Sequence, residues 1–318
     1  MKWNEHAITI EEACRISAAK PALADNAAPV ISKGERERSE LQPIEGTRVF
    51  DDIYWVGSRS VGAIAIDTGD GLILIDDGSN EEEARFMERS IRRLGLDPAD
   101  IRMIIISHEH FDHYGGTTYF LEQVCPNAKV AISRLGWNLL QTVPTEFAFT
   151  QPRPTRADLL LEDGMCIRHG HTEILTVATP GHSLGCMSFI ISSAWKGEPL
   201  RVAMLGGSAV WPNQPEIRSY QSSLAYFKLF TDLAQCNAFT GTHQPQAAID
   251  AVRLAVEGEG SHPWICRPEE LDQVYYQDYR DRLVKTLQNP GLQTYRKPVP
   301  AKGGLPRIEG SPIPELEE

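Results

Sequence analysis

Three histidines and an aspartate fall within six residues, directly after a run of apolar side chains. The apolar run, residues 101–107, is rich in β-branched residues and predicts a buried strand. Four polar side chains cannot all be satisfied in a dry core, so the chain must reach a polar edge where this strand ends. Imidazole nitrogen and carboxylate oxygen are donors that zinc prefers, so the cluster predicts a metal site. It consists of His108, His110, Asp112 and His113.

The spacing within the cluster divides it between two ions. Alternate residues of an extended segment point the same way, so His108 and His110 can bind one ion together. Asp112 and His113 begin the next turn and can bind a second ion. The cluster alone supplies two ligands to each ion, so further ligands are expected from elsewhere in the chain.

Two single histidines follow other predicted strands. His182 lies just after the strand that ends at Ala178, and His243 follows the short strand 238–240, each close to a glycine. Alone, either would be an ordinary loop histidine. Together with the cluster, three strand ends that converge on one edge provide six ligands, enough for two ions with three protein ligands each.

The remaining pattern alternates strands with amphipathic helices in two successive halves. Strands come first in each half, which predicts two stacked sheets with helices outside. Residues 47–288 form this predicted domain, residues 1–46 an N-terminal extension, and residues 289–318 an irregular Pro-rich tail. The predicted helices are residues 81–94, 220–233 and 269–287.

Composition excludes several classes of partner. The chain has 318 residues and a formal net charge of −12, which repels nucleic acid. No apolar run approaches the roughly 20 residues of a membrane span, and the N-terminal residues lack the apolar core of a secretory signal. Six scattered cysteines form no C-x-x-C pair and predict no disulfide framework. We therefore expect a cytoplasmic protein that acts on a small molecule; its oligomeric state is left open.

The motifs resemble those of the metallo-β-lactamase superfamily. The matching segments are Ser107–Gly116, Thr179–His182 and Thr242–His243. The resemblance implies a four-layer αββα sandwich of the α/β (α+β) class and two zinc ions per chain. It assigns one ion to His108, His110 and His182, and the other to Asp112, His113 and His243.

The sequence departs from part of that superfamily at a later predicted strand. Many relatives, including glyoxalase-type thioesterases and lactonases, carry a metal-bridging aspartate there, whereas this chain has Gly206–Ser208. That pattern, and the segment Ser261–Trp264, resemble subclass three of the class B β-lactamases. Ser208 would then hydrogen-bond a water on the second zinc. Val210 stands where some of those enzymes have a serine that binds the substrate carboxylate, which argues against penicillin-type recognition.

The resemblance implies a hydrolase that opens a cyclic amide by attack of metal-bound hydroxide, with Asp112 orienting the hydroxide and shuttling a proton. The missing export signal and Val210 favour detoxification of a ring other than a β-lactam over antibiotic resistance. The alternatives are a lactonase or other ester or thioester hydrolase with the same metals, and a non-catalytic metal-binding relative.

Other polar residues near the motifs have more ordinary predicted roles. Asp76 ends a buried strand, and we expect it either to accept a hydrogen bond from the metal-binding loop or to hold backbone amides near it. Glu109 is expected to point to the surface or cap a helix, and Asp77 to be exposed to solvent. His169 and His171 flank a glycine and predict a hairpin tip without metal.

Overall fold

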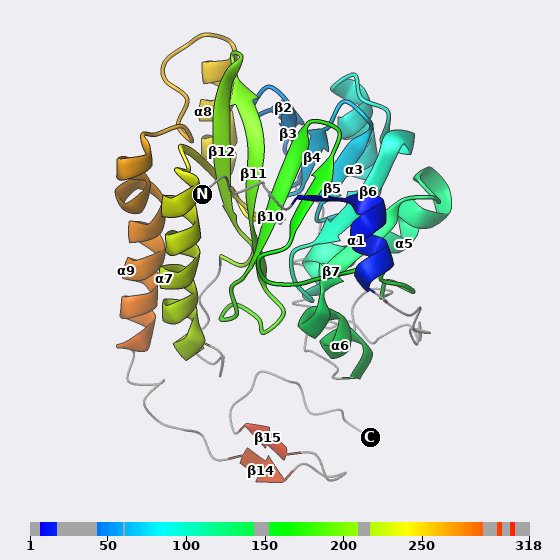
Figure 1. The fold of residues 1–318 in the computed structure, drawn as a ribbon, viewed down its shortest axis with the longest axis vertical. Helices are drawn as coiled ribbons and strands as arrows, with labels where there is room; N and C mark the ends of the chain where they lie inside the picture. The colour runs from blue at the N-terminus through cyan, green and yellow to red at the C-terminus, as the bar shows by residue number, and fades with distance from the viewer. Residues whose placement is uncertain are drawn as a thin grey trace.

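The computed structural model describes residues 7–17, 43–59, 61–142, 153–208 and 217–288, together with two short strands at 298–300 and 306–308. Two sheets pack face to face, and helices cover their outer faces (Figure 1). The four-layer αββα sandwich predicted from the sequence is confirmed.

The first sheet has seven strands in the order β2-β3-β4-β5-β6-β7-β8. Neighbours from β2 to β5 are antiparallel, and those from β5 to β8 are parallel. The carboxyl ends of β5, β6 and β7 therefore meet at one edge. The strands are β2 (Thr47–Arg48), β3 (Ile53–Trp55), β4 (Ile64–Asp67), β5 (Leu72–Ile75), β6 (Ile101–Ile106), β7 (Lys129–Ser133) and β8 (Leu159–Leu161).

The second sheet has six strands in the order β1-β9-β10-β11-β12-β13. The hairpins β9-β10, β10-β11 and β11-β12 are antiparallel, while β1 is parallel to β9 and β13 to β12. The strands are β1 (Ile8–Thr9), β9 (Cys166–His169), β10 (Thr172–Ala178), β11 (Met187–Trp195), β12 (Glu198–Leu205) and β13 (Ala238–Gly241).

Strand β5 shows why the central strands are apolar at every position. Successive side chains of a strand point to opposite faces. Ile73 and Ile75 join the core between the sheets, whereas Leu72 and Leu74 pack beneath the outer helices. All four are buried, so no position on β5 faces water. An uninterrupted apolar run is the signature of a strand covered on both faces.

The outer helices divide between the two sheets, as Figure 1 shows. Helix α3 (Glu81–Arg93) packs Ala84, Met87 and Ile91 on the first sheet. Helices α7 (Ile217–Ala234) and α9 (Gln277–Leu287) lie side by side on the second sheet. The other helices are α1 (Ile10–Ser17), α4 (Phe111–Tyr114), α5 (Thr117–Tyr119), α6 (Arg134–Thr142) and α8 (Gln246–Val256).

Short elements of the structure lie outside the predicted domain 47–288 at both ends. Residues 8–17 belong to the sandwich, because β1 pairs with β9 and Ile10 and Ala13 of α1 are buried in the core between the sheets. The predicted irregular tail contains one antiparallel pair, β14 (Pro298–Pro300) with β15 (Pro306–Ile308). The predicted helix 269–287 consists of a 3-10 turn, Pro268–Glu270, then a π-helical turn, Asp272–Tyr276, and then α9.

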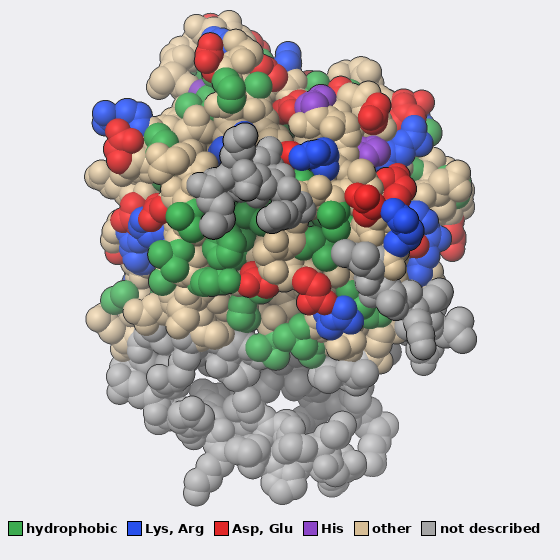
Figure 2. Space-filling view, in the orientation of Figure 1, with side chains coloured by type: hydrophobic (Ala, Val, Ile, Leu, Met, Phe, Trp, Pro, Cys, Tyr) green, Lys and Arg blue, Asp and Glu red, His purple; other side chains and the backbone are tan. Residues whose placement is uncertain are grey.

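The surface is mixed in charge. On the face shown in Figure 2, Lys and Arg side chains of the described residues lie beside Asp and Glu side chains. No helix in the described part of the chain is both long and apolar enough to cross a bilayer.

Candidate metal centre

The predicted ligands come from loops at one end of the sandwich. The β6 loop (residues 107–116) follows β6, and the β10 loop (residues 179–186) follows β10. The backbone joins them at their base, because the amide of Met187 donates to the carbonyl of Ser107 over 2.9 Å. His243 follows β13 in the same sheet as β10. The topology thus brings three distant segments of the sequence to one edge.

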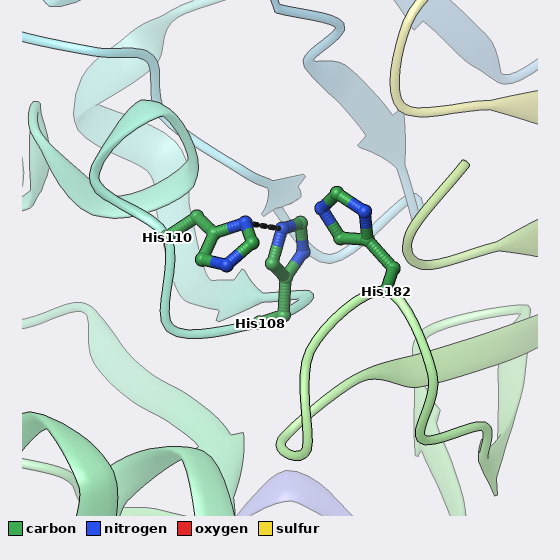
Figure 3. A group of neighbouring side chains, drawn as sticks. All are labelled: His108, His110 and His182. Atoms are coloured by element: carbon green, nitrogen blue, oxygen red, sulfur yellow. Dashed lines mark hydrogen bonds between the residues drawn. The ribbon is translucent and has the colours of Figure 1, made fainter. Parts of the chain in front are cut away.

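The first donor group consists of His108, His110 and His182. Their ring centroids form a nearly equilateral triangle with sides of 4.6, 4.7 and 4.7 Å. His108 Nε2 lies 3.1 Å from His110 Nδ1, and the ring of His182 approaches from the opposite loop (Figure 3). One donor atom from each lies within 4.8 Å of the others. Three imidazole nitrogens this close together would fit the ligand set of one zinc ion.

The second donor group consists of Asp112, His113 and His243. Asp112 Oδ2 lies 3.5 Å from His113 Nε2 and 3.8 Å from His243 Nε2. His113 Nε2 is buried and has no hydrogen-bond partner among the described residues. Leaving a buried polar atom unpaired is costly, so this nitrogen fits a metal ligand.

The two groups touch one another. The ring centroids of His108 and His113 are 3.9 Å apart. Burial first, and the neighbouring histidines second, lower the pKa of His108, and burial lowers the pKa of His110 to about 4. Both imidazoles are therefore neutral at physiological pH, the form that binds a metal.

Asp76 holds the second group in place. Its carboxylate accepts hydrogen bonds from the amide (2.8 Å) and hydroxyl (2.9 Å) of Ser107 and lies 2.7 Å from His113 Nδ1. A proton on Nδ1 leaves Nε2 free for a metal. Burial lowers the pKa of His113, but Asp112 and Asp76 outweigh it and raise this pKa to about 9. Without a metal the ring therefore carries protons on both nitrogens at neutral pH, and a metal at Nε2 has to displace the proton there. Asp76 has a φ of 62°, a conformation that aspartate tolerates better than most residues.

Ser107 is a contributor that our sequence analysis missed. Its hydroxyl lies 3.0 Å from His108 Nδ1 as well as 2.9 Å from Asp76 Oδ2. The Ser107 hydroxyl thereby connects Asp76, which orients the second donor group, to His108 of the first donor group. The available signal was its position, one residue before the first histidine at the strand end.

The comparisons with known proteins point to one superfamily. Residues 56–194 match the family model described as the metallo-β-lactamase superfamily. This segment of the chain is therefore similar to a metallo-β-lactamase domain, and it makes up less than half of the chain. A solved B3 metallo-β-lactamase with an active-site glutamic acid shares 25% identity and a TM-score of 0.62, covering 83% of this chain and 98% of its own. The native FEZ-1 metallo-β-lactamase from Legionella gormanii, at 23% identity and a TM-score of 0.63, shares the fold over 78% of this chain and 99% of its own.

The curated relatives match only part of this chain. The mitochondrial persulfide dioxygenase of Homo sapiens is 31% identical over 119 residues, 36% of this chain and 39% of that protein. An N-acyl homoserine lactonase of Agrobacterium fabrum is 32% identical over 110 residues, 32% of this chain and 40% of that protein. The chain thus spans about two fifths of the length of these relatives.

The turn after β12 contains no carboxylate, and its two glycines are required by close packing. A Cβ at Gly206 would lie 1.9 Å from the carbonyl oxygen of Met187. A Cβ at Gly207 would lie 2.6 Å from Cβ and Cδ2 of His182, so the turn packs directly against a predicted ligand. Ser208 follows, largely buried, and its carbonyl accepts from Arg282 Nη1 over 3.4 Å. Val210 lies outside the described residues.

Two predictions about neighbouring acids were wrong. Asp77 is fully buried rather than exposed; it accepts from the Gly116 amide and the Thr117 hydroxyl, and burial raises its pKa to about 8. Glu109 is 2% exposed, and its carboxylate bonds to the β10 loop instead of reaching the surface or a helix end. The alternation of side chains along an extended segment predicts which face each side chain lies on. It does not predict which other segment of the chain covers that face.

The second His-x-His segment lies away from this centre. His169 and His171 flank the tight turn between β9 and β10, as predicted. His169 Nε2 lies 3.1 Å from the carbonyl of Asp70, and His171 Nε2 lies 3.4 Å from Asp52. Neither belongs to a three-residue donor group within the described ranges.

Proposed function

We propose that this protein is a dinuclear zinc hydrolase that opens a small cyclic amide. The observation that carries the proposal is the pair of touching donor groups, one of three histidines and one of an aspartate and two histidines. All six donors are nitrogen or carboxylate oxygen, which suits zinc. Zinc, when bound, activates water as a nucleophile near neutral pH and polarises a carbonyl oxygen.

The residues of the chain have separate roles in this proposal. His108, His110 and His182 would hold one ion, and Asp112, His113 and His243 the other. Asp112 Oδ2 faces His113 and His243, and the side chain is 24% exposed, so water can reach the carboxylate. Asp112 would therefore orient the attacking water and accept its proton.

The turn after β12 favours an amide over an ester substrate. With glycine at 206 and 207 and serine at 208, no carboxylate from this turn bridges the two groups. This matches the pattern of subclass-three β-lactamases, in which the residue matching His113 takes the second zinc. Ser208 would hydrogen-bond a water near that ion. Amide nitrogen is a poor leaving group, so a second ion that stabilises it is of most use in opening a lactam.

A lactonase is the second candidate, and a specific finding favours it. N-acyl homoserine lactonases are among the curated relatives of this chain. A lactone needs less help for its leaving group, so the same ligands would support its hydrolysis. The relative rates on lactams and lactones therefore distinguish the two candidates.

The experiment combines elemental analysis with ring-opening assays. We expect about two zinc ions per chain and turnover of at least one lactam among a cephalosporin and a benzoxazolinone-type lactam. Faster opening of a γ-lactone with no lactam turnover would select the lactonase. Iron in place of zinc would overturn the zinc assignment, and a zinc-loaded protein inert on all three rings would indicate a non-catalytic metal-binding protein.

A further inference from the structure

Glu109 lies between two proposed ligands in the sequence, but its carboxylate binds the opposite loop. Its Oε2 accepts from the Ser183 hydroxyl over 3.0 Å, and its Oε1 accepts from the Gly185 amide over 3.3 Å. These two donors lie on either side of the residue at the tip of the β10 loop. The first of them, Ser183, directly follows His182. Glu109 thus connects the two loops that supply the three-histidine group.

Gly185 is packed to receive this contact. Its carbonyl accepts from the Ser133 hydroxyl over 2.6 Å, which anchors the loop to the end of β7. A Cβ at residue 185 would lie 2.3 Å from Glu109 Oε2 and 2.5 Å from the α-carbon of Gly136. Only glycine lets the loop approach the carboxylate this closely. The contact is therefore part of the loop's packed conformation.

We propose that Glu109 is a positioning residue that holds His182 against His108 and His110. The backbone hydrogen bond from Met187 to Ser107 anchors the β10 loop at its base. The side chain of Glu109 anchors the same loop at its tip, beside His182. Without the tip anchor, His182 would sample positions too far from the other two rings to share an ion. The inference rests on the proposed function only in requiring that the three-histidine group binds a metal.

The two hydrogen bonds, rather than the charge, carry this role. In Glu109→Gln, the amide oxygen can still accept from Gly185, and the amide nitrogen can donate to the Ser183 hydroxyl, which both donates and accepts. Glu109→Ala removes both bonds. Gly185→Ala keeps the glutamate but adds a methyl group that displaces its carboxylate. The conservative variant should therefore preserve metal binding, and the other two should weaken it.

The experiment measures Co²⁺ binding to the full chain by visible absorption. His243→Ala serves as the parent because it lacks a ligand of the second group, so the titration reports the three-histidine group. We expect Glu109→Ala and Gly185→Ala to raise the Co²⁺ dissociation constant by about 10- to 100-fold. Glu109→Gln should stay close to the parent value.

Glu83 provides a matched control. It is a buried glutamate that also accepts from one serine hydroxyl, that of Ser58, and one backbone amide, that of Ser79. Those partners lie outside both the β6 and the β10 loop. Glu83→Ala should lower the unfolding temperature, yet leave the Co²⁺ dissociation constant of the three-histidine group unchanged.

Two results would overturn the inference: a Glu109→Ala protein that binds Co²⁺ as the parent does, or a Glu83→Ala protein weakened to the same extent. If Glu109→Ala does not fold, Ser183→Ala removes one of the two bonds at little cost in volume. We expect it to raise the dissociation constant by a smaller factor, and an unchanged value would reject the proposal. A parent that binds no Co²⁺ would instead reject the metal centre itself, and the proposed function with it.

Discussion

The two ends of the sandwich gather similar side chains and use them differently. At one end of β10 lies the candidate metal centre. At the other end lies a groove of about 620 Å³, lined by Asp51, Asp52, Asp67 and His171 among others. Both ends combine carboxylates with a histidine of a His-x-His segment. Side-chain type alone does not distinguish the end that carries chemistry.

The difference lies in what each carboxylate binds. In the groove, Asp51 accepts from the amides of Lys196 and Gly197, and Asp67 accepts from the amide of Gly69, so these acids serve tight turns. Asp52 in the groove lies against a single imidazole, that of His171. At the metal centre, Asp76 and Asp112 lie against histidines that belong to a group of donors. Carboxylates that orient histidines toward a common point indicate a metal site, and carboxylates that cap turns do not.

Removing a histidine from each end should give the largest contrast. We expect His110→Ala to lose the metal of the three-histidine group and the hydrolytic activity together, because two remaining ligands hold zinc poorly. His171→Ala, the equivalent position of the other His-x-His segment, should keep both. Metal content and ring-opening rate measure the contrast. Equal metal loss in the two variants would remove the distinction between the ends.

Replacing one carboxylate at each end should give the next largest effect. Asp112→Asn should lower the ring-opening rate by about a thousandfold, even if the variant keeps part of its zinc. The reason is that general-base assistance contributes about 10²–10⁴-fold to such reactions. Asp51→Asn in the groove should leave the rate unchanged. The rate is measured at matched zinc content. A near-wild-type rate for Asp112→Asn would contradict the role proposed for this carboxylate.

The third effect separates orientation from ligation. Asp76→Asn keeps an acceptor for the Ser107 amide but presents an amide N–H toward His113 Nδ1. That favours the tautomer with a proton on His113 Nε2, the atom needed for the metal. We expect about 10- to 100-fold weaker binding at the second group, measured by zinc titration against a chromophoric chelator.

Asp67→Asn is the control for that measurement. It changes a groove aspartate whose carboxylate accepts a hydrogen bond from the turn amide of Gly69. Zinc affinity should be unaffected. If both variants bound zinc as the wild type does, the contact between Asp76 and His113 would have only a structural role.

How much of this the sequence could predict depends on the range of the interactions. The predicted sandwich followed from local patterns: apolar runs such as residues 72–75 and amphipathic segments such as residues 81–94. The six candidate donors followed from strand-end histidines, because strand ends converge on sheet edges, whereas the resemblance to the superfamily assigned His182 and His243 to their groups. Both signals lie within a few residues of chain.

The errors concern contacts between segments far apart in the sequence. Asp77 was expected to be exposed because aspartates usually are, but it is covered by the helical turn that begins near Gly116. Glu109 was expected at the surface, but it reaches Ser183, 74 positions away. The amino-acid sequence around Asp77 or Glu109 does not indicate which distant segment packs over that residue.

The smallest effect concerns stability at the groove end. Burial raises the pKa of Asp52, and hydrogen bonding by the Ser193 hydroxyl and the charge of His171 offset this only in part. The folded state therefore holds the proton of the Asp52 carboxyl group more tightly than the unfolded state does. The resulting contribution to stability is fully present below the ordinary pKa of 3.8, and it is lost as the pH rises through the raised pKa of the folded state.

Asp52→Asn should therefore flatten the dependence of unfolding free energy on pH above about pH 4, relative to the wild type. Ser193→Ala should steepen it, because removing the hydroxyl raises the pKa of Asp52 further. Urea unfolding across this pH range measures both. Zinc-site histidines contribute equally to all three proteins, so the differences isolate Asp52. Parallel pH profiles would mean that Asp52 ionises normally, and that the groove acids differ from those of the metal centre in their partners alone.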